Sequence, residues 1–266
     1  MAWSEHQHAQ LRAMGLRLWS PPAALEEPAA VAAPAPRAAA PETTTSTTLA
    51  RVALPRSPQP ATATASPLAA LGWPELRAAV AQCQACGLCE SRTQTVFGVG
   101  HEQAQWMVVG EAPGENEDKQ GEPFVGAAGQ LLDRMLAALK LTRSSEDEEG
   151  DRTPAQRVYI ANTLKCRPPR NRNPSPEEMA QCEPFLVRQI ELLKPRIILA
   201  MGRFAVQALL RSDEPIGRLR GRVHHYQGVP LVVTYHPDYL LRSPLDKAKA
   251  WEDLCLAADV AEGIQA

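Results

Sequence analysis

Short apolar runs alternate with amphipathic segments from about residue 71 onward. Four runs have the length and continuous apolar character of buried strands: 106–109, 158–160, 197–199 and 231–233. Apolar residues recur with helical spacing in four longer segments: 126–141, 175–193, 203–210 and 246–260. Strands separated by helical crossovers favour a mostly parallel sheet that is covered on both faces. We therefore expect an α/β fold, a single three-layer α/β/α domain with a four-stranded, mostly parallel central sheet.

The segment 175–193 also carries a helix start signal. Ser175 is in position to act as the N-cap, Pro176 occupies the first helical position, and Glu178 completes a capping box. In folds of this class, ligands bind at the carboxyl ends of the strands. Residues that directly follow the four apolar runs are therefore the first candidates for a functional site.

Residues 1–70 have a different composition from the rest of the chain. They hold 10 of the 24 prolines, together with alanine-rich runs such as AAVAAPAPRAAA. Few large apolar side chains are present to offset the entropy of ordering the backbone. We expect a disordered, partly extended linker over 21–70 and a globular domain over 71–266. The segment 3–19 is interpreted either as a frayed apolar end or as a docking peptide for a replication or repair protein, because its GLRLW ending is similar to short motifs that bind DNA sliding clamps.

The charge balance excludes a broad basic surface. The chain has 28 lysines and arginines against 30 acidic residues, so non-specific wrapping of nucleic acid is not expected. Basic residues gather locally in KCRPPRNR (165–172), which contains Lys165 and Arg167, at positions 218, 220 and 222, and at Arg242. These clusters are either solvated loops or one edge that contacts phosphates. The acidic run 144–151 is expected to be a solvated loop.

The sequence contains no signal for a membrane or for secretion. No stretch approaches the roughly 20 apolar residues of a spanning helix, and acidic and histidine residues precede any apolar run at the N-terminus. We expect a soluble cytoplasmic protein, in which cysteines are thiols or metal ligands rather than disulfides.

Four of the six cysteines have a spacing that suggests a metal site. Cys83 and Cys86 form a C-x2-C pair after a short amphipathic helix that begins near Trp73. Cys166 lies just past an expected strand, and Cys182 lies inside the next expected helix. All-cysteine ligand sets bind zinc or an iron–sulfur cluster. Free buried thiols are the alternative.

The remaining two cysteines complicate this assignment. Cys89 forms a second C-x2-C pair with Cys86, so five candidates compete for four positions. Cys255 lies on the apolar side of the last expected helix and is interpreted as a small buried hydrophobic residue.

A series of motifs gives the chain a family resemblance. After the C-x2-C pair come RTQTVFGVG (92–100), GEAPGENED (110–118), GEPFVGAAGQLL (121–132), NTLKCRPP (162–169) and HPDYLLR (236–242). In this order they closely resemble the family 4 uracil-DNA glycosylases, bacterial and archaeal enzymes that contain a 4Fe-4S cluster. The resemblance runs from Cys83 to about Val260. It implies a monofunctional enzyme that hydrolyses the N-glycosidic bond of uracil in DNA and initiates base-excision repair.

The resemblance also implies which cysteines bind the cluster. Cys83, Cys86, Cys166 and Cys182 would be the ligands, and Cys89 would not. The cluster would then be structural, since it would connect the N-terminal helix to the loop 165–172.

Further implied roles concern the flipped base. A uracil taken out of the DNA stack must be stacked, read along its pairing edge and stabilised as an anion when it leaves. By resemblance, Phe124 stacks on uracil, Asn162 pairs with its O4 and N3–H, and the imidazole of His236 donates to O2. The backbone around Gly110 and Ala112 supplies further contacts. The alternatives are core packing for Phe124 and a turn or cap role for Asn162.

The attacking water has no obvious base. The family 1 enzymes have an aspartate at the position that Ala112 occupies here. We expect Glu111 to support the water and Glu117 to help close the pocket against the C5 methyl group of thymine. Stabilisation of the leaving group then carries most of the catalysis.

The motif HPDYLLR also suggests DNA contacts. Leu240 or Leu241 is expected to wedge into the gap left by the flipped base, the other leucine to join the core, and Arg242 to bind a phosphate. A cross-linking branch of the superfamily has a basic, histidine-containing loop after the asparagine strand. This chain lacks that loop, so we expect turnover rather than a covalent adduct.

Two other classes of function remain as hypotheses. The first is a non-catalytic iron–sulfur module that binds DNA or the replication machinery, and the second is a zinc-stabilised hydrolase. No lysine is placed to form a Schiff base, so strand cleavage is not expected. The expected partner is uracil-containing DNA, single- or double-stranded, bound by a monomer at the nucleoid.

Overall fold

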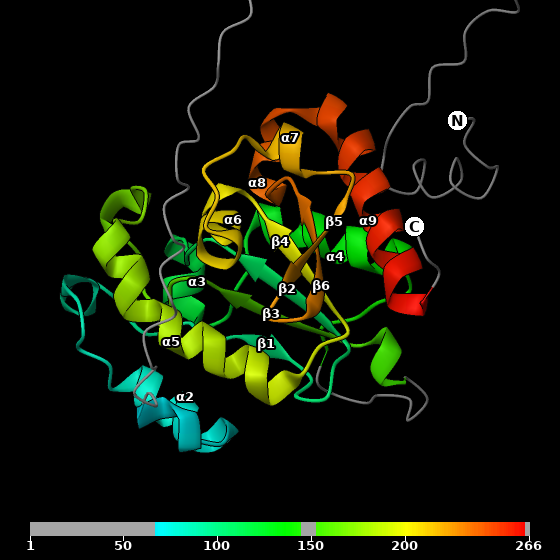
Figure 1. Cartoon of the computed structure of the whole chain (residues 1–266). Coiled ribbons are helices and arrows are strands. Elements are labelled where there is room, and N and C mark those ends of the chain that lie inside the picture. The colour runs from blue at the N-terminus through cyan, green and yellow to red at the C-terminus, as the bar shows by residue number, and fades with distance from the viewer. Residues whose placement is uncertain (1–66, 145–152, 264–266) are drawn as a thin grey trace, which may run out of the picture. The chain divides into compact units, whose positions relative to one another are not determined.

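The computed structural model describes residues 67–144 and 153–263 (Figure 1). The segment 3–19, most of the expected linker and most of the acidic run 144–151 lie outside the described residues. The last four residues of the expected linker, Pro67–Ala70, form a short 3-10 helix, η1, and Leu68 packs against a hydrophobic cluster of the domain. The ordered domain therefore includes η1.

The central sheet contains the four expected strands. These are β2 (Trp106–Gly110), β3 (Val158–Asn162), β4 (Ile197–Met201) and β6 (Val229–Thr234). They pair in parallel in the order β3-β2-β4-β6. The parallel core of the sheet is thus confirmed, because continuous apolar runs are typical of strands buried on both faces.

The sheet has two more strands than expected. β1 (Val99–Gly100) pairs antiparallel with β3, and β5 (Val223–Tyr226) pairs antiparallel with β6. The full order is β1-β3-β2-β4-β6-β5. Edge strands are short and partly exposed, so they lack the apolar run by which the inner strands were predicted. β1 has two residues and β5 reads VHHY.

Helices connect the strands and cover both faces of the sheet. The described α-helices are α2 (Trp73–Ala81), α3 (Glu115–Gln120), α4 (Ala127–Ala138), α5 (Pro176–Leu193), α6 (Arg203–Leu210), α7 (Ile216–Leu219), α8 (Pro237–Arg242) and α9 (Lys247–Glu262). The described 3-10 helices, besides η1, are η2 (Gly87–Glu90), η3 (Pro154–Gln156), η4 (Pro169–Asn171) and η5 (Pro244–Asp246). Ser175 caps α5 as predicted, because its hydroxyl accepts from the backbone N of Glu178 at 3.2 Å.

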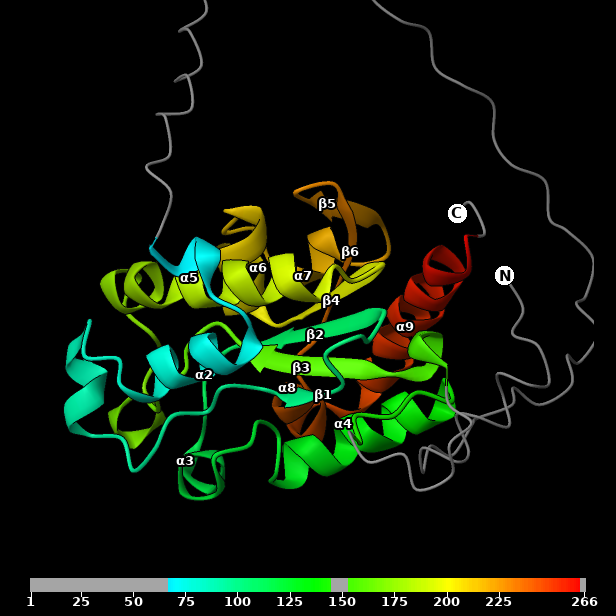
Figure 2. The ribbon, with the colours of Figure 1, turned by 90° about the horizontal axis from the view of Figure 1, so that it is seen from below.

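The helices form two layers around the sheet. Figure 2 shows α5, α6 and α7 on one face and α4 and α9 on the other. Leucine, isoleucine and valine side chains of α5 and α6 pack with one set of alternating strand residues in a buried cluster. The three-layer α/β/α arrangement is therefore confirmed. No helix within the two described ranges is long and apolar enough to cross a membrane.

The sheet topology brings three chain segments together at one edge. From β2, the chain continues to β3 on one side, and β4 lies on the other side of β2. Such a reversal of strand order opens a crevice at the carboxyl ends. Gly110 at the end of β2 is in register with Asn162 at the end of β3, and β6 ends two residues before His236.

Candidate active site

A cavity of about 290 Å³ lies at this carboxyl edge of the sheet. Six residues with expected roles at the base or the water line it: Glu111, Ala112, Glu117, Phe124, Asn162 and His236. They come from the segments after β2 and β6, from the last residue of β3, from α3 and from the loop between α3 and α4. The fold therefore brings together residues that are up to 125 positions apart in the sequence.

Asn162 lines this cavity from the end of β3. Its side chain is 3% exposed, and its Oδ1 atom has no hydrogen-bond partner among the described residues. A buried acceptor that stays unpaired costs about 1–3 kcal/mol, so a site of this kind is suited to a ligand that donates a hydrogen bond. Gly110 allows the arrangement: a Cβ atom there would lie 2.7 Å from Cζ of Phe124 and still closer to Oδ1 of Asn162.

Phe124 forms an aromatic wall together with His236. The two rings stack with their centroids 5.4 Å apart and an interplanar angle of 29°. Phe124 has a backbone φ of 56°, a left-handed conformation that is rare for a bulky residue and that persists only where the surroundings enforce it. Arg143 supplies this restraint, since its guanidinium donates to the carbonyls of Pro123 at 2.9 Å and Phe124 at 3.0 Å.

Glu117 fixes the other side of the Phe124 loop. One carboxylate oxygen accepts from the backbone N of Gly114 at 3.1 Å. The other accepts from the backbone N of Val125 at 3.0 Å and of Gly126 at 3.3 Å. Glu117 thus joins the start of α3 to the loop that carries Phe124, while it lines the cavity. Its role against the methyl group of thymine stays a prediction.

His236 presents a neutral imidazole with a defined tautomer. It is the N-cap residue of α8, and its Nδ1 accepts from the backbone N of Asp238 at 3.2 Å. An acceptor at Nδ1 assigns the proton of the neutral ring to Nε2. Burial lowers the pKa of His236 to about 4. At neutral pH the ring is therefore an Nε2–H donor without a net charge.

Glu111 has an unusually basic carboxyl group. It follows β2, lines the cavity, and its backbone carbonyl accepts from the backbone N of Leu164 at 3.1 Å. Burial raises the pKa of Glu111 to about 7, while the positive charge of Arg203 acts against this shift and the negative charge of Asp238 adds to it. A carboxyl group with this pKa changes its charge near neutral pH.

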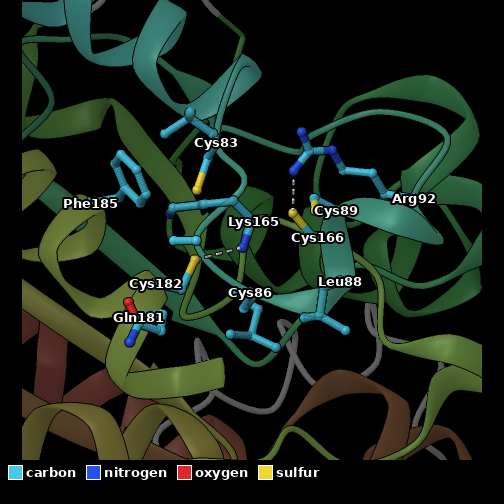
Figure 3. A pocket seen from close by; sticks show the side chains of 13 residues that line it. Cys83, Cys86, Leu88, Cys89, Arg92, Lys165, Cys166, Gln181, Cys182 and Phe185 are labelled. Atoms are coloured by element: carbon cyan, nitrogen blue, oxygen red, sulfur yellow. Dashed lines mark hydrogen bonds between the residues drawn. The ribbon is translucent and has the colours of Figure 1, made fainter. Parts of the chain in front are cut away.

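The second cavity of interest is lined by cysteines (Figure 3). It contains all five cysteines that compete for the metal: Cys83, Cys86, Cys89, Cys166 and Cys182. Two N–H groups point at their sulfur atoms. Nη1 of Arg92 donates to Sγ of Cys166 at 3.1 Å, and the backbone N of Lys165 donates to Sγ of Cys182 at 3.2 Å. The fold therefore brings together two cysteine pairs that are far apart in the sequence.

Within the described ranges, no group of three or more histidine, cysteine or acidic side chains is arranged to hold a single metal ion. Burial raises the pKa of the Cys166 thiol and raises that of Cys182 to about 12. A bound metal offsets this effect, because a coordinating thiol is deprotonated outright.

Two of the residues expected to contact DNA, Lys165 and Leu240, are buried. Lys165 is 1% exposed, so it cannot reach a phosphate; its Nζ donates to the carbonyl of Asn162 and to Oε1 of Gln189. Leu240 is fully buried on the inner side of α8 and cannot act as a wedge, whereas Leu241 on the same helix is 41% exposed. Helical geometry explains this difference, since consecutive residues lie about 100° apart around the axis.

The arginines of the expected basic edge also differ from one another. Arg220 forms ion pairs with Asp253 at 3.0 Å and Glu252 at 2.9 Å on α9, so its role is structural. Arg242 is exposed and pairs with Asp238 on the cavity rim. Arg167 is partly buried and donates to Oδ1 of Asn171 at 2.8 Å, beside the cavity.

Sequence reasoning missed two residues of the site. Arg143 restrains Phe124 from a position 19 residues later, and no local pattern marks a loop arginine as the partner of a distant carbonyl. Asp238 lines the cavity and supplies the N–H that fixes the His236 tautomer. The motif HPD did contain a signal, because a residue two positions after an N-cap commonly donates to the cap side chain.

Comparison with known proteins defines the family. The profile described as the uracil DNA glycosylase superfamily matches residues 97–255, more than half of the chain. A type-4 uracil-DNA glycosylase of Archaeoglobus fulgidus is 43% identical over 173 residues, which cover 62% of this chain and 81% of the relative. The chain belongs to the type-4 uracil-DNA glycosylase family.

Other type-4 uracil-DNA glycosylases show the same level of similarity. The enzyme of Pyrobaculum aerophilum is 41% identical over 192 residues, 68% of this chain and 91% of the relative. That of Saccharolobus solfataricus is 42% identical over 173 residues, 62% of this chain and 75% of the relative. Every residue that lines the cavity, from Glu111 to Asp238, lies within the matched range 97–255. The family resemblance seen in the motifs is confirmed.

Proposed function

We propose that the protein hydrolyses the N-glycosidic bond between uracil and deoxyribose in DNA, releases free uracil and leaves the strand intact. The observation that carries the proposal is the pairing, around one cavity, of a buried amide with an unpaired acceptor and a neutral imidazole donor. Membership of the type-4 family supports the same reaction. All of these groups belong to one chain, so we propose that the protein acts as a monomer. We also propose that its substrate is nucleoid DNA in the cytoplasm.

Asn162 is proposed to select uracil. Its Oδ1 accepts from N3–H, and its amide nitrogen donates to O4. Cytosine presents the opposite pattern, an acceptor at N3 and an amino donor at C4, so both contacts would become repulsive or unpaired. The unpaired state of Oδ1 in the free protein supports this role, because bound uracil would supply the missing donor. Phe124 closes the cavity beside the plane of the base.

His236 is proposed to stabilise the leaving uracil anion. As the glycosidic bond breaks, negative charge develops on O2, and the Nε2–H of the neutral imidazole donates to it. Preorganised donors of this kind lower the barrier by about 3–4 kcal/mol. The proton on Nε2 remains on the ring. The pKa of about 4 describes the loss of a proton from the imidazolium ion, and the neutral imidazole that results is a very weak acid. Uracil therefore leaves as an anion held by a hydrogen bond.

Glu111 is proposed to orient the attacking water when its side chain is ionised to the carboxylate. Because the pKa of Glu111 is raised to about 7, the carboxylate is protonated as the pH falls below neutrality. We expect kcat/KM for uracil release to fall by about tenfold per pH unit below pH 7. His236 adds no change over this range, since its pKa of about 4 lies well below it.

Glu111→Gln provides the control for this pH dependence. The variant is expected to have lower activity and a level profile from acidic to mildly basic pH, measured by release of radiolabelled uracil under single-turnover conditions. A wild-type profile that is already level through pH 7 would contradict the role of the ionised carboxylate.

The cysteine cavity is proposed to hold a 4Fe-4S cluster, with Cys83, Cys86, Cys166 and Cys182 as ligands. The donor set fits, because iron–sulfur clusters take four cysteine thiolates, one at each iron. The N–H groups of Arg92 and Lys165 that point at sulfur fit as well, since hydrogen bonds to the sulfurs tune such clusters. A bound cluster would supply a covalent connection between the η2 region, the loop after β3 and α5.

The cluster proposal predicts a coloured protein. Anaerobically purified protein is expected to be brown, with broad visible absorption and about four irons per chain. Cys166→Ala is expected to lose this absorption, whereas Cys89→Ala is expected to keep it. A colourless protein with stoichiometric zinc would contradict the proposal and favour a zinc-stabilised hydrolase.

Leu241 is proposed to occupy the gap that the flipped base leaves in duplex DNA. It is exposed on α8 three residues after Asp238, and residues three apart share one face of a helix. Arg242 and Arg167 are proposed phosphate contacts at the same rim. We expect Leu241→Ala to reduce kcat/KM about tenfold on double-stranded substrate and less on single-stranded substrate, where no stack must be held open.

Leu245→Ala is the matched control for this prediction. Leu245 is 93% exposed but lies in η5, beyond the end of α8. It is expected to have wild-type activity on both substrates. Equal losses in the two variants on duplex DNA would contradict the assignment of Leu241 as the wedge.

The experiment that tests the proposed function is a base-release assay with the purified protein. Single- and double-stranded oligonucleotides that carry uracil, hypoxanthine or xanthine are incubated, and the free base and the intact abasic strand are quantified. We expect release of uracil without strand cleavage. Binding of uracil-containing DNA without release of any base would overturn the proposal and favour a non-catalytic DNA-binding module.

A further inference from the structure

Lys165 is a buried ammonium between the two cavities. It lies three residues after Asn162 and one before Cys166, and it is 1% exposed. Its Nζ donates to the backbone carbonyl of Asn162 at 2.8 Å and to Oε1 of Gln189 at 2.6 Å. Both acceptors are neutral. A buried charge with neutral partners remains costly unless an anion lies close by.

Sulfur atoms lie next to Lys165. It lines the cysteine cavity, its own backbone N donates to Sγ of Cys182 at 3.2 Å, and Cys166 is the next residue in the chain. Figure 3 shows Lys165 between these two cysteines, with Arg92 on the far side of Cys166. The cavity therefore has two cationic neighbours, which fits the net negative charge of a cluster bound by four thiolates.

Gln189 holds the ammonium from the opposite side. Its Nε2 donates to the carbonyl of Phe97 at 2.9 Å and to Oη of Tyr159 at 3.3 Å, so its Oε1 is turned toward Lys165. Gln189 belongs to α5, the helix that also carries Cys182. The position of the ammonium is thus set by the same elements that form the cysteine cavity.

We infer that Lys165 is a positioning residue that couples the cysteine cavity to the uracil pocket. The inference rests on the proposed function. The negative charge of a bound cluster would keep the ammonium in place, and the ammonium holds the carbonyl of Asn162 at the end of β3. Oδ1 of Asn162 has no hydrogen-bond partner among the described residues. The direction of the side-chain amide therefore depends on the backbone, which Lys165 holds at the carbonyl. Loss of the negative group would therefore weaken recognition of the base.

Three variants of the holoprotein separate charge from hydrogen bonding. Lys165→Met removes the charge and the contact to Asn162. Gln189→Glu keeps an acceptor for the ammonium but adds a carboxylate that competes with the cluster for its charge. Gln189→Met is the comparison variant without added charge: it loses the same donations to Phe97 and Tyr159, and it also loses the acceptor for the ammonium. The readouts are the decay of visible absorption in the presence of an iron chelator, the affinity for free uracil by calorimetry, and kcat and KM on single-stranded DNA.

Each variant has its own expected pattern. In Lys165→Met, cluster loss accelerates about tenfold and the affinity for free uracil falls about tenfold, because a charged hydrogen bond and a buried counter-charge are both lost. In Gln189→Glu, cluster loss accelerates relative to Gln189→Met, while the affinity for uracil follows that of Gln189→Met. The increase in KM is expected to exceed the decrease in kcat in Lys165→Met.

The inference is overturned by any of three results. Lys165→Met with wild-type cluster lifetime and uracil affinity contradicts it directly. If Lys165→Met does not fold, equal cluster lifetimes in Gln189→Glu and Gln189→Met contradict it instead. Absence of iron from the purified wild-type protein also contradicts the inference, because the proposed counter-charge for Lys165 would then be missing. Cluster lifetime and uracil affinity do not depend on turnover, so a wild-type protein that binds uracil but releases none would refute the proposed function and leave the coupling supported.

Discussion

Replacing His236 with alanine is expected to lower kcat for uracil release by about 10²–10³-fold, the usual effect of removing one preorganised donor from a developing anion. The ring is neutral and its Nε2–H is free to donate, since Nδ1 accepts from the backbone N of Asp238. The loss should fall on kcat rather than on KM, because the charge on O2 appears only in the transition state. Single-turnover release of labelled uracil measures this effect.

His236 also has a structural role that needs its own control. As the N-cap of α8 it accepts from the backbone N of Asp238, and His236→Ala removes this capping hydrogen bond too. His236→Asn keeps a good N-cap residue but is too short to reach the base. It should therefore show near wild-type thermal unfolding and the same loss of kcat. Retention of wild-type kcat in His236→Asn would contradict the donor role.

Replacing Asn162 with alanine is expected to lower kcat/KM by about 10²–10⁴-fold, because two hydrogen bonds to the base edge are lost in a buried site. The free energy of unfolding should not fall in proportion. Oδ1 of Asn162 is already buried without a partner in the free protein, so removing it also removes a desolvation cost of about 1–3 kcal/mol. Chemical denaturation of both proteins measures this second quantity.

Asn162→Asp is the control of equal shape. A carboxylate accepts from N3–H but cannot donate to O4, so this variant separates the two hydrogen bonds. We expect release of uracil to be reduced here as well, with weaker binding of free uracil. Wild-type activity in Asn162→Ala, or a large loss of stability that accounts for its inactivity, would contradict the proposed reading of the base edge.

The four inner strands and the main residues of the pocket could be predicted from the sequence for a common reason. Parallel strands are buried on both faces and therefore read as continuous apolar runs. Functional side chains then follow them directly, as Asn162 and His236 do. Two separate local patterns were thus enough to place residues 74 positions apart at one edge of the sheet.

Other features depend on tertiary structure and had no local signal. A lysine in a basic run is typical of a surface, and only packing against α5 shows that Lys165 is buried. Leu240 and Leu241 are chemically identical, and the phase of α8 against α4 decides which of them is exposed. The restraint of Phe124 by Arg143 joins two loops whose proximity no pattern records.

The left-handed backbone at Phe124 has a consequence for how the enzyme meets its substrate. Hydrogen bonds from Arg143 and to Glu117 hold this loop before any DNA arrives. Preorganisation of this kind places the entropy cost of shaping the aromatic wall on folding rather than on association. A pyrimidine that swings out of the helix is thus expected to meet an aromatic wall that is already formed.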